Sequence, residues 1–305
     1  MSTFRSGFAC FVGRPNAGKS TLTNALVGEK VAITSSKPQT TRHAIRGLVH
    51  RPDAQLVLVD TPGLHRPRNT LGQRLNDLVR TTWAEVDTVA MCLPADQKVG
   101  PGDKFLIKEL AALRRKPVLA VVTKTDLVGP EQLGEHLLSV QAAGQQAGLE
   151  WREIVPVSAV RHDQVDLLAD LLVATLPEGV PMYPEGHLTD EPEEILVAEV
   201  VREAALEGVR DELPHSLAVV VDEMVPREDR PADRPLIDVR VNVYVERDSQ
   251  KGIIIGKKGS RLKEIGQTSR VQIEKILGTP VYLDLHVKVA KDWQRDPKQL
   301  RKLGF

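Results

Sequence analysis

Residues 13–20, with the sequence GRPNAGKS, constrain the fold of this chain more than any other segment. They fit the pattern G-x4-G-K-[S/T] and lie between an apolar run and an amphipathic stretch, the strand–loop–helix setting of a phosphate-binding loop. Glycines let backbone N–H groups turn toward phosphate oxygens, and the helix N-terminus adds partial positive charge. Lys19 is predicted to reach the β- and γ-phosphates of a nucleotide, and the Ser20 hydroxyl to bind Mg²⁺. The competing interpretation is a glycine-rich turn with a solvated lysine.

Short apolar runs alternate with longer amphipathic stretches over residues 1–176. We expect strands at residues 8–12, 55–60, 88–93, 117–123 and 154–157. We expect helices at residues 18–27, 70–85, 102–115, 131–147 and 163–175. The alternation predicts an α/β P-loop NTPase domain, a doubly wound sheet with ligands at the C-terminal ends of its strands. A run at residues 43–49 follows another strand candidate without an intervening helix, which predicts one antiparallel edge strand in a mixed, mostly parallel sheet.

The tetrapeptide DTPG follows the predicted strand 55–60. It places Asp60 near the metal and the Gly63 N–H near the γ-phosphate. Before that strand lies a polar loop, TSSKPQTTR, of the kind that orders around Mg²⁺ and the γ-phosphate and relaxes after hydrolysis. Thr40 or Thr41 would supply a second hydroxyl ligand, and Thr41 is favoured. A merely solvated loop is the alternative.

The tetrapeptide TKTD at the end of the predicted strand 117–123 indicates which base is bound. The Asp126 carboxylate can accept from the N1–H and N2–H₂ donors of guanine, while the stem of Lys124 packs on the base. Adenine lacks that donor pair, so an unpaired buried carboxylate would disfavour ATP. Farther along, Ser158 and Ala159 end another strand, where a backbone N–H can meet guanine O6. Four such motifs in order predict a GTP site.

Leu64 follows DTPG at the position where many GTPases carry a glutamine that orients water. A leucine side chain cannot hold water, so the sequence predicts slow intrinsic hydrolysis. The remaining catalytic groups act by position and charge: Lys19, Mg²⁺ and the loop N–H groups.

A second domain is predicted after a linker. Residues 177–191 are rich in Pro, Gly and acidic side chains and are typical of a linker. Residues 192–305 then give an αββααβ order, an α+β module. Its elements are expected at residues 192–208, 217–225, 236–246, a short helix before 256, a long helix to about 277, and 281–290.

Within that module, residues 256–259 read GKKG and lie between three isoleucines and the long predicted helix. This matches the GxxG loop of a KH fold, in which glycines let the backbone approach a sugar-phosphate chain and lysines neutralise phosphates. The alternative is a lysine-bearing turn between core helices. The basic tail, from Lys288 to Lys302, could extend an RNA contact or lie near an anionic surface.

The charge distribution supports this division. The whole chain has a formal net charge of zero, but residues 177–235 carry 5 basic and 16 acidic side chains, and residues 236–305 carry 15 and 8. A basic end after an acidic stretch indicates a nucleic-acid or anionic-membrane surface. Cys10 and Cys92 each lie in an apolar run, which predicts core positions in a reducing compartment. No signal peptide or membrane span is expected, so the predicted location is cytoplasmic or peripheral to the membrane.

Together GRPNAGKS, SSKPQTTRH, DTPGLHRP, LPEGVPMYPEGHLTDEP, GIIIGKKGSRLKEIG and VYLDLHVKVAKDW resemble the Era-type GTPases of bacteria over nearly the whole chain. The resemblance implies a Ras-like domain followed by a type II KH domain. It also implies GTP-dependent binding near the 3′ end of 16S ribosomal RNA, assistance to 30S subunit maturation, no DNA partner and a monomer. The main departure is Thr123, where the family's guanine motif normally has Asn.

The resemblance completes the predicted site residues. The nucleotide-binding set is Gly13, Asn16, Ala17, Gly18, Lys19, Ser20, Thr21, Asp60, Gly63, Thr123, Lys124, Asp126, Leu127, Ser158 and Ala159. The catalytic set is Lys19, Asn16, Thr41 and Gly63, and the metal ligands are Ser20, Thr41 and Asp60. The RNA-binding set is Ile253, Ile254, Ile255, Gly256, Lys257, Lys258, Gly259 and Arg261. Related GTPases with a hydrophobic residue at the Leu64 position use a phosphate-loop Asn to bind K⁺, so Asn16 implies potassium stimulation beside GTP/GDP and Mg²⁺.

Two other functions stay open from the sequence. One is an RNA-modifying GTPase, for which no second catalytic constellation is visible. The other is a non-hydrolysing RNA-binding scaffold with a structural nucleotide, against which Ser20, Asp60 and Gly63 argue.

Overall fold

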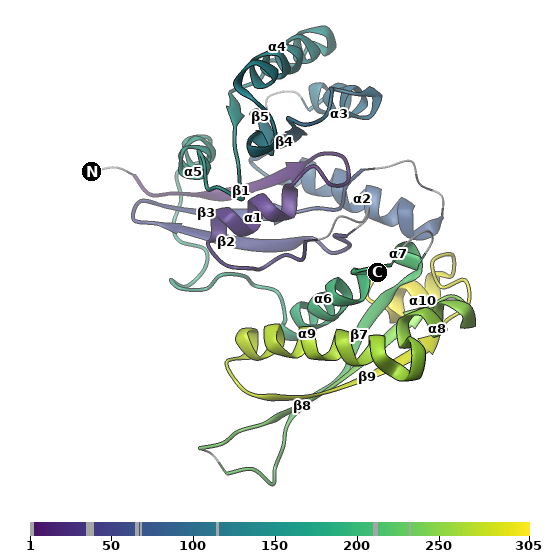
Figure 1. The fold of residues 1–305 in the computed structure, drawn as a ribbon. Coiled ribbons are helices and arrows are strands. Elements are labelled where there is room, and N and C mark those ends of the chain that lie inside the picture. Colours follow the sequence, from purple (N-terminus) through teal and green to yellow (C-terminus); the bar gives the residue numbers. More distant parts are fainter. Residues whose placement is uncertain are drawn as a thin grey trace. The chain divides into compact units, whose positions relative to one another are not determined.

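The computed structural model describes residues 3–34, 40–64, 67, 69–113, 116–209, 213–231 and 233–305. The chain forms two compact units, the first built mainly from residues up to Asp190 and the second mainly from those after it (Figure 1).

The first unit alternates strands and helices. Its strands are β1 (Arg5–Val12), β2 (Ile45–Arg51), β3 (Ala54–Asp60), β4 (Thr88–Pro94), β5 (Val118–Thr123) and β6 (Ile154–Pro156). Its helices are α1 (Lys19–Val27), α2 (Thr70–Glu85), α3 (Pro101–Ala111), α4 (Pro130–Ala147) and α5 (Val165–Ala174), with a 3-10 turn η1 (Thr125–Leu127).

These strands form one sheet in the order β2-β3-β1-β4-β5-β6. All neighbouring pairs are parallel except β2 and β3, which are antiparallel. The predicted mixed sheet with one antiparallel edge is therefore confirmed. Because the parallel strands point the same way, their C-terminal ends bring the loops after β1, β3, β5 and β6 to one edge of the sheet.

Alternating side chains of the central strands build a core on each face of the sheet. Cys10 and Val12 of β1 pack with α2, α3 and α4, through side chains such as Trp83 and Val140. Ala9 and Phe11 of β1 pack on the other face with α1 and α5. A strand buried on both faces is nearly all apolar, which explains the continuous hydrophobic runs in the sequence.

Helix α3 ends at Ala111, four residues before the predicted end. The chain turns there, with hydrogen bonds from Leu113 N to Leu110 O and from Lys116 N to Leu113 O. The Lys116 ammonium then donates to the carbonyl oxygens of Trp83, Ala84 and Val86 at the end of α2. Helical periodicity in the sequence shows neither these turns nor the long-range contact of Lys116 with the end of α2.

The segment expected as a linker packs along the first unit. Gly179 N donates to Phe4 O, and Leu48 N on β2 donates to Leu188 O. The side-chain oxygen of Gln55 accepts from the backbone N–H groups of Met182 and Tyr183. These bonds satisfy backbone groups of a stretch with no regular secondary structure of its own.

The second unit has the predicted αββααβ order with two short additional helices. Its elements are α6 (Glu193–Leu206), α7 (Leu213–Ser216), β7 (Ala218–Pro226), β8 (Ile237–Val245), α8 (Asp248–Ile255), the 3-10 turn η2 (Lys257–Gly259), α9 (Ser260–Leu277), β9 (Val281–Val289) and α10 (Pro297–Lys302). The sheet order is β7-β8-β9, with β7 antiparallel and β9 parallel to β8.

One face of this three-stranded sheet holds the core. Alternate residues of β8, such as Val241 and Val243, are fully buried against apolar side chains of α6, α8 and α9. Strand β9 lies at an edge of the sheet, beside the long helix α9. In the part of the chain that the structure describes, no helix is long and apolar enough to span a membrane.

Candidate nucleotide-binding and RNA-binding sites

The phosphate loop adopts a conformation that its glycines permit. Gly18 has φ 88° and Asn16 has φ 63°, both in the left-handed region. A Cβ on Gly13 would lie 2.8 Å from the carbonyl oxygen of Cys92 on the neighbouring strand β4, so only glycine fits there. Ala17, within the same loop, is fully buried.

Lys19 begins α1 and its side chain is buried over the loop. Its ammonium donates to Gly13 O at 3.3 Å and to Arg14 O at 3.2 Å. Burial lowers the pKa of Lys19, and the nearby Asp60 carboxylate partly opposes this effect. A buried cation held only by carbonyl oxygens is poised for an anionic ligand, whose charge would favour the protonated form.

Three oxygen-bearing side chains meet beside Lys19. Ser20 Oγ donates to Asp60 Oδ2 at 2.6 Å, and Thr41 Oγ1 donates to the same oxygen at 3.2 Å. The two hydroxyl oxygens lie 3.0 Å apart. Two hydroxyls and one carboxylate are hard oxygen ligands of the kind that Mg²⁺ accepts alongside substrate phosphates. The structure thus brings together the three predicted metal ligands, from α1, the loop before β2 and the end of β3.

Gly63 lies directly against the phosphate loop. A Cβ at this position would be 2.9 Å from the backbone nitrogen of Pro15, so a side chain here would push the two loops apart. The next residue, Leu64, is buried in the core with Val79 and Leu93. A buried apolar side chain cannot orient an attacking water, so slow intrinsic hydrolysis stays a prediction.

An ion pair not anticipated from the sequence anchors the phosphate loop. Arg14 Nε donates to Asp103 Oδ1 at 2.7 Å, and Arg14 Nη2 donates to Gln97 Oε1 at 3.2 Å. Asp103 is buried in the first turn of α3, where its other oxygen accepts from Gly100 N at 2.9 Å. Asp103 is recognisable in the sequence as an acidic residue in the first turn of a predicted helix. Its pairing with Arg14, 89 residues away, cannot be predicted from a local pattern.

The residues predicted to bind guanine lie at the end of β5 and after β5 and β6. Thr123 is buried, and its hydroxyl donates to Ala17 O at 2.7 Å. Lys124 has φ 58°, a left-handed turn that begins the 3-10 turn carrying Asp126. Ser158 Oγ donates to Asp126 Oδ1 at 2.7 Å, so the hydroxyl orients the carboxylate. Leu127, in contrast, is 60% exposed at the edge of this region.

Both cysteines are buried, as the sequence predicted. Burial raises the pKa of both thiols, that of Cys92 to about 12, so they stay protonated and unreactive.

The GKKG loop of the second unit is the 3-10 turn η2 and its flanking glycine. Gly256 and Gly259 have φ 72° and 79°, and Lys258 has φ 53°. A Cβ on Gly256 would lie 2.7 Å from Arg261 Cβ, so glycine is required at this point. Lys257 and Lys258 are both exposed at the start of α9. The loop therefore presents two cations and a close backbone at a helix N-terminus, which suits phosphate groups.

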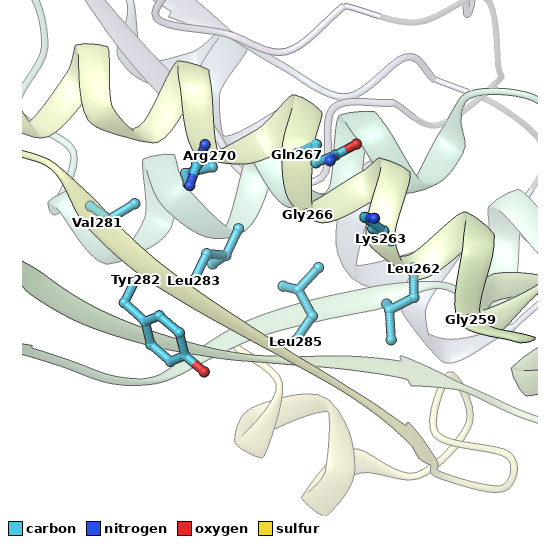
Figure 2. A pocket seen from close by; sticks show the side chains of 10 residues that line it. All are labelled: Gly259, Leu262, Lys263, Gly266, Gln267, Arg270, Val281, Tyr282, Leu283 and Leu285. Carbon is cyan, nitrogen blue, oxygen red and sulfur yellow. The ribbon is translucent and has the colours of Figure 1, made fainter.

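A groove of about 450 Å³ runs from this loop between α9 and the edge strand β9 (Figure 2). It is lined by Gly259, Leu262, Lys263, Gly266, Gln267, Arg270, Val281, Tyr282, Leu283 and Leu285. Leucines of both elements form its apolar floor, while Lys263, Gln267 and Arg270 stand along the helix. Of these residues the sequence analysis predicted only Gly259, although Gly266 on the helix and the alternation of Leu283 and Leu285 were visible signals for the others.

The predicted RNA-binding residues do not all reach this surface. Ile253 is 51% exposed, but Ile254 is fully buried in the core of the second unit. The reason is the helical period of α8, which turns adjacent isoleucines to different sides. The Arg261 guanidinium donates to Ala205 O and Glu207 O, where it caps the end of α6.

Comparisons with known proteins agree with both sites. A family model described as "50S ribosome-binding GTPase" matches residues 8–124, and one described as "KH domain" matches residues 212–294. GTPase Era of Streptomyces coelicolor is 71% identical over 301 residues, covering 99% of this chain and 95% of that protein. GTPase Era of Mycobacterium avium is 64% identical over 307 residues, covering 100% of each.

Solved structures give the same result. A crystal structure of an Aquifex aeolicus Era variant bound to GDP and AlF4⁻ is 36% identical, with a TM-score of 0.92 over 99% of each chain. A crystal structure of Era in complex with MgGDPNP and nucleotides 1506–1542 of 16S ribosomal RNA is 38% identical, with the same TM-score and coverage. Since the relatives match over almost their entire length and the phosphate loop, guanine motif and GKKG loop are all formed, the chain belongs to the GTPase Era family.

Proposed function

We propose that this GTPase binds GTP with Mg²⁺, hydrolyses it to GDP and phosphate, and binds 16S ribosomal RNA near its 3′ end during 30S subunit maturation. The contact of Ser20, Thr41 and Asp60 beside the buried Lys19 carries the nucleotide part of the proposal. The groove beside the GKKG loop carries the RNA part. The Era structures with MgGDPNP and a 16S fragment support both.

On the nucleotide side, Lys19 would neutralise the β- and γ-phosphates, and backbone N–H groups of the loop would contact their oxygens. Ser20 and Thr41 would hold Mg²⁺ directly, with Asp60 in the same cluster. When bound, Mg²⁺ neutralises charge that develops on the phosphates. Gly63 would bring its N–H to the γ-phosphate, since its backbone already lies against Pro15.

Guanine would be selected by Asp126, with the aliphatic stem of Lys124 against the base. The Ser158 hydroxyl keeps the carboxylate oriented before the nucleotide arrives, which reduces the entropic cost of binding. ATP would leave the acidic group without its donor pair.

Potassium stimulation through Asn16 is part of the proposal. Two observations support it: Asn16 is exposed on the phosphate loop in a left-handed conformation, and Leu64 is buried where a water-orienting glutamine would be needed. A monovalent cation beside the phosphates would add positive charge to that of Lys19. Equal hydrolysis rates in K⁺ and Na⁺ buffers, or equal K⁺ stimulation in Asn16→Ala, would contradict it.

On the RNA side, unstacked bases would lie on the apolar floor while Lys257 and Lys258 bind the sugar-phosphate chain. A KH loop holds about four nucleotides in this way. Because β9 is an edge strand, backbone N–H and C=O groups on its outer side are available to base edges, apart from the Val281 N–H, which donates to Glu274 Oε1. Single strands would be bound in preference to duplexes, since their bases can be splayed out into the groove.

The proposed GTP hydrolysis is tested by measuring phosphate release from GTP. Lys19→Ala should lower GTP turnover by at least about 100-fold, because a buried cation on the transferred group is lost. Lys108→Ala, an exposed lysine of α3, should leave turnover unchanged. Guanine-nucleotide retention without any turnover in the unmodified protein would instead favour the non-hydrolysing scaffold.

RNA binding is tested by reversing the charge of the GKKG loop. Lys257→Asp with Lys258→Asp should abolish binding of a 16S 3′-end fragment and leave GTP affinity nearly unchanged. The same double change at Lys104 and Lys108 of α3 is the matched control and should leave RNA binding unaltered. Unchanged RNA affinity in the loop variant would remove the KH assignment. Peripheral membrane contact and the monomeric state stay predictions.

A further inference from the structure

Tyr282 lies at the end of the groove that is farthest from the GKKG loop. It borders the groove beside Val281 and Arg270. Its ring, however, projects on the other side of β9 from Leu283 and Leu285, away from α9 (Figure 2). The side chain is 56% exposed, a large fraction for an aromatic residue in a strand.

The Tyr282 ring is held in place by its neighbours. The Arg227 guanidinium carbon is 5.2 Å from the ring centroid, a cation–π arrangement. Arg227 Nε and Nη2 in turn donate to the two oxygens of Asp238, and Asp238 is the residue paired with Tyr282 across the sheet. An aromatic side chain fixed in this way gives a ready surface for stacking, with little conformational freedom left to lose.

We propose that Tyr282 stacks the base of an RNA nucleotide that lies just outside the groove, so that this chain binds at least one nucleotide more than the groove holds. This inference rests on the RNA-binding function proposed above. Every base has a π-face, so stacking on a tyrosine accepts any nucleotide, and an adjacent arginine adds cation–π and phosphate contacts.

The strand topology around Tyr282 indicates the path by which the RNA leaves. At the start of β9, Arg227 pairs with Asp238, and the exposed Arg270 lies 3.9 Å from Glu274. Two arginines therefore border Tyr282, each beside an acidic partner. Since β9 is an edge strand, a chain leaving the groove at Val281 reaches Tyr282 by passing over that edge.

A purely structural role for Tyr282 predicts different behaviour. In that case the Arg227–Tyr282–Asp238 contact only joins β9 to the β7–β8 hairpin, and its loss changes the melting temperature without changing how affinity depends on RNA length.

The test measures affinity against RNA length with the full-length protein. A 16S 3′-end fragment is shortened one nucleotide at a time until the shortest RNA that still binds is found, and that RNA is then extended at its 5′ or its 3′ end. Extension at one end should raise the affinity of the unmodified protein by about five- to a hundred-fold. Tyr282→Ala should remove this gain, so that this variant binds the extended and the shortest RNA with equal affinity, while Tyr282→Phe should keep the gain.

Phe105→Ala truncates another exposed aromatic side chain, in α3, and serves as the matched control with an unchanged gain. Melting curves establish that each variant is folded. A gain that persists in Tyr282→Ala, or no gain at either end, overturns the inference. These results differ from failure of the RNA-binding function itself, in which no RNA binds or binding ignores Lys257 and Lys258.

Discussion

The hydroxyl of Thr123, at the end of β5, donates a 2.7 Å hydrogen bond to the carbonyl oxygen of Ala17 in the phosphate loop. This bond joins the strand that carries the guanine motif to the loop that carries Lys19. The usual Asn of the family motif is absent, but a shorter hydroxyl side chain makes the connection to the phosphate loop. The two halves of the nucleotide site are therefore coupled through one buried bond.

Thr123→Val should weaken guanine-nucleotide binding. The isosteric change leaves the buried Ala17 carbonyl without its donor, a cost of about 1–3 kcal/mol in unfolding free energy, and the less firmly held phosphate loop should bind the nucleotide less tightly. Thr123→Ser retains the hydroxyl and should stay within about three-fold of the unmodified protein. Titration with a fluorescent GDP analogue measures both. Equal affinities for the Val and unmodified forms would show that the bond does not organise the loop.

Asp103→Asn should loosen the phosphate loop through Arg14. The loop arginine would lose its charged partner, and because Arg14 is partly exposed we expect a loss of about 1–3 kcal/mol in unfolding free energy, with weaker GTP binding. Urea denaturation and nucleotide titration give the two quantities. Glu109→Gln is the matched control, since its pair with Arg80 is exposed and 3.6 Å long, and its removal should cost less than about 0.5 kcal/mol. Similar effects of the two variants would contradict a special role for the buried pair.

His136 should make the protein less stable in mild acid. It is buried on α4, and burial lowers its pKa from the usual 6.5, although Asp103 and Asp96 oppose this. Above pH 6.5 both folded and unfolded states hold the imidazole neutral. Below it the unfolded state binds the proton first, so stability falls as pH drops toward the lower folded pKa, by at most about 1.4 kcal/mol per pH unit. His136→Gln should reduce this slope between pH 6.5 and 5 in urea denaturation. An unaltered slope would mean that other groups dominate.

Two glycines of α4 should respond oppositely to alanine. A Cβ on Gly144 would lie 2.3 Å from Trp151 Nε1, which donates to Val140 O, so Gly144→Ala should cost about 1–3 kcal/mol by overpacking. Gly134 has nothing within 4 Å of such a Cβ, and Gly134→Ala should stabilise the helix by about 0.5–1 kcal/mol. Thermal melting of the pair checks this, and a shift in the same direction for both would refute the packing argument.

Local sequence patterns predicted most of the fold. Helix α2 has the bounds that its apolar spacing predicted, and β2 is the antiparallel edge that the missing crossover helix implied. The predicted end of α3 was four residues too late, because the helix ends at Ala111. Beyond it, the Lys116 ammonium donates to carbonyl oxygens at the end of α2, a contact that no local pattern shows. The short helices α7 and α10 were missed because four and six residues are too few to show a period.

The sequence by itself determined the family and the motifs of its sites: GRPNAGKS, DTPG, TKTD and GKKG predict, in that order, a phosphate loop, a metal carboxylate, a guanine carboxylate and a KH loop. Each of these motifs consists of residues that are adjacent in the sequence, so each can be recognised from a short segment. Tertiary structure alone decided which side chains meet across the chain, such as Arg14 with Asp103, Thr123 with Ala17, and Tyr282 with Arg227 and Asp238. It also buried Ile254 while leaving Ile253 exposed. Such pairings arise from strand order and packing between segments far apart in sequence, and no local pattern encodes them.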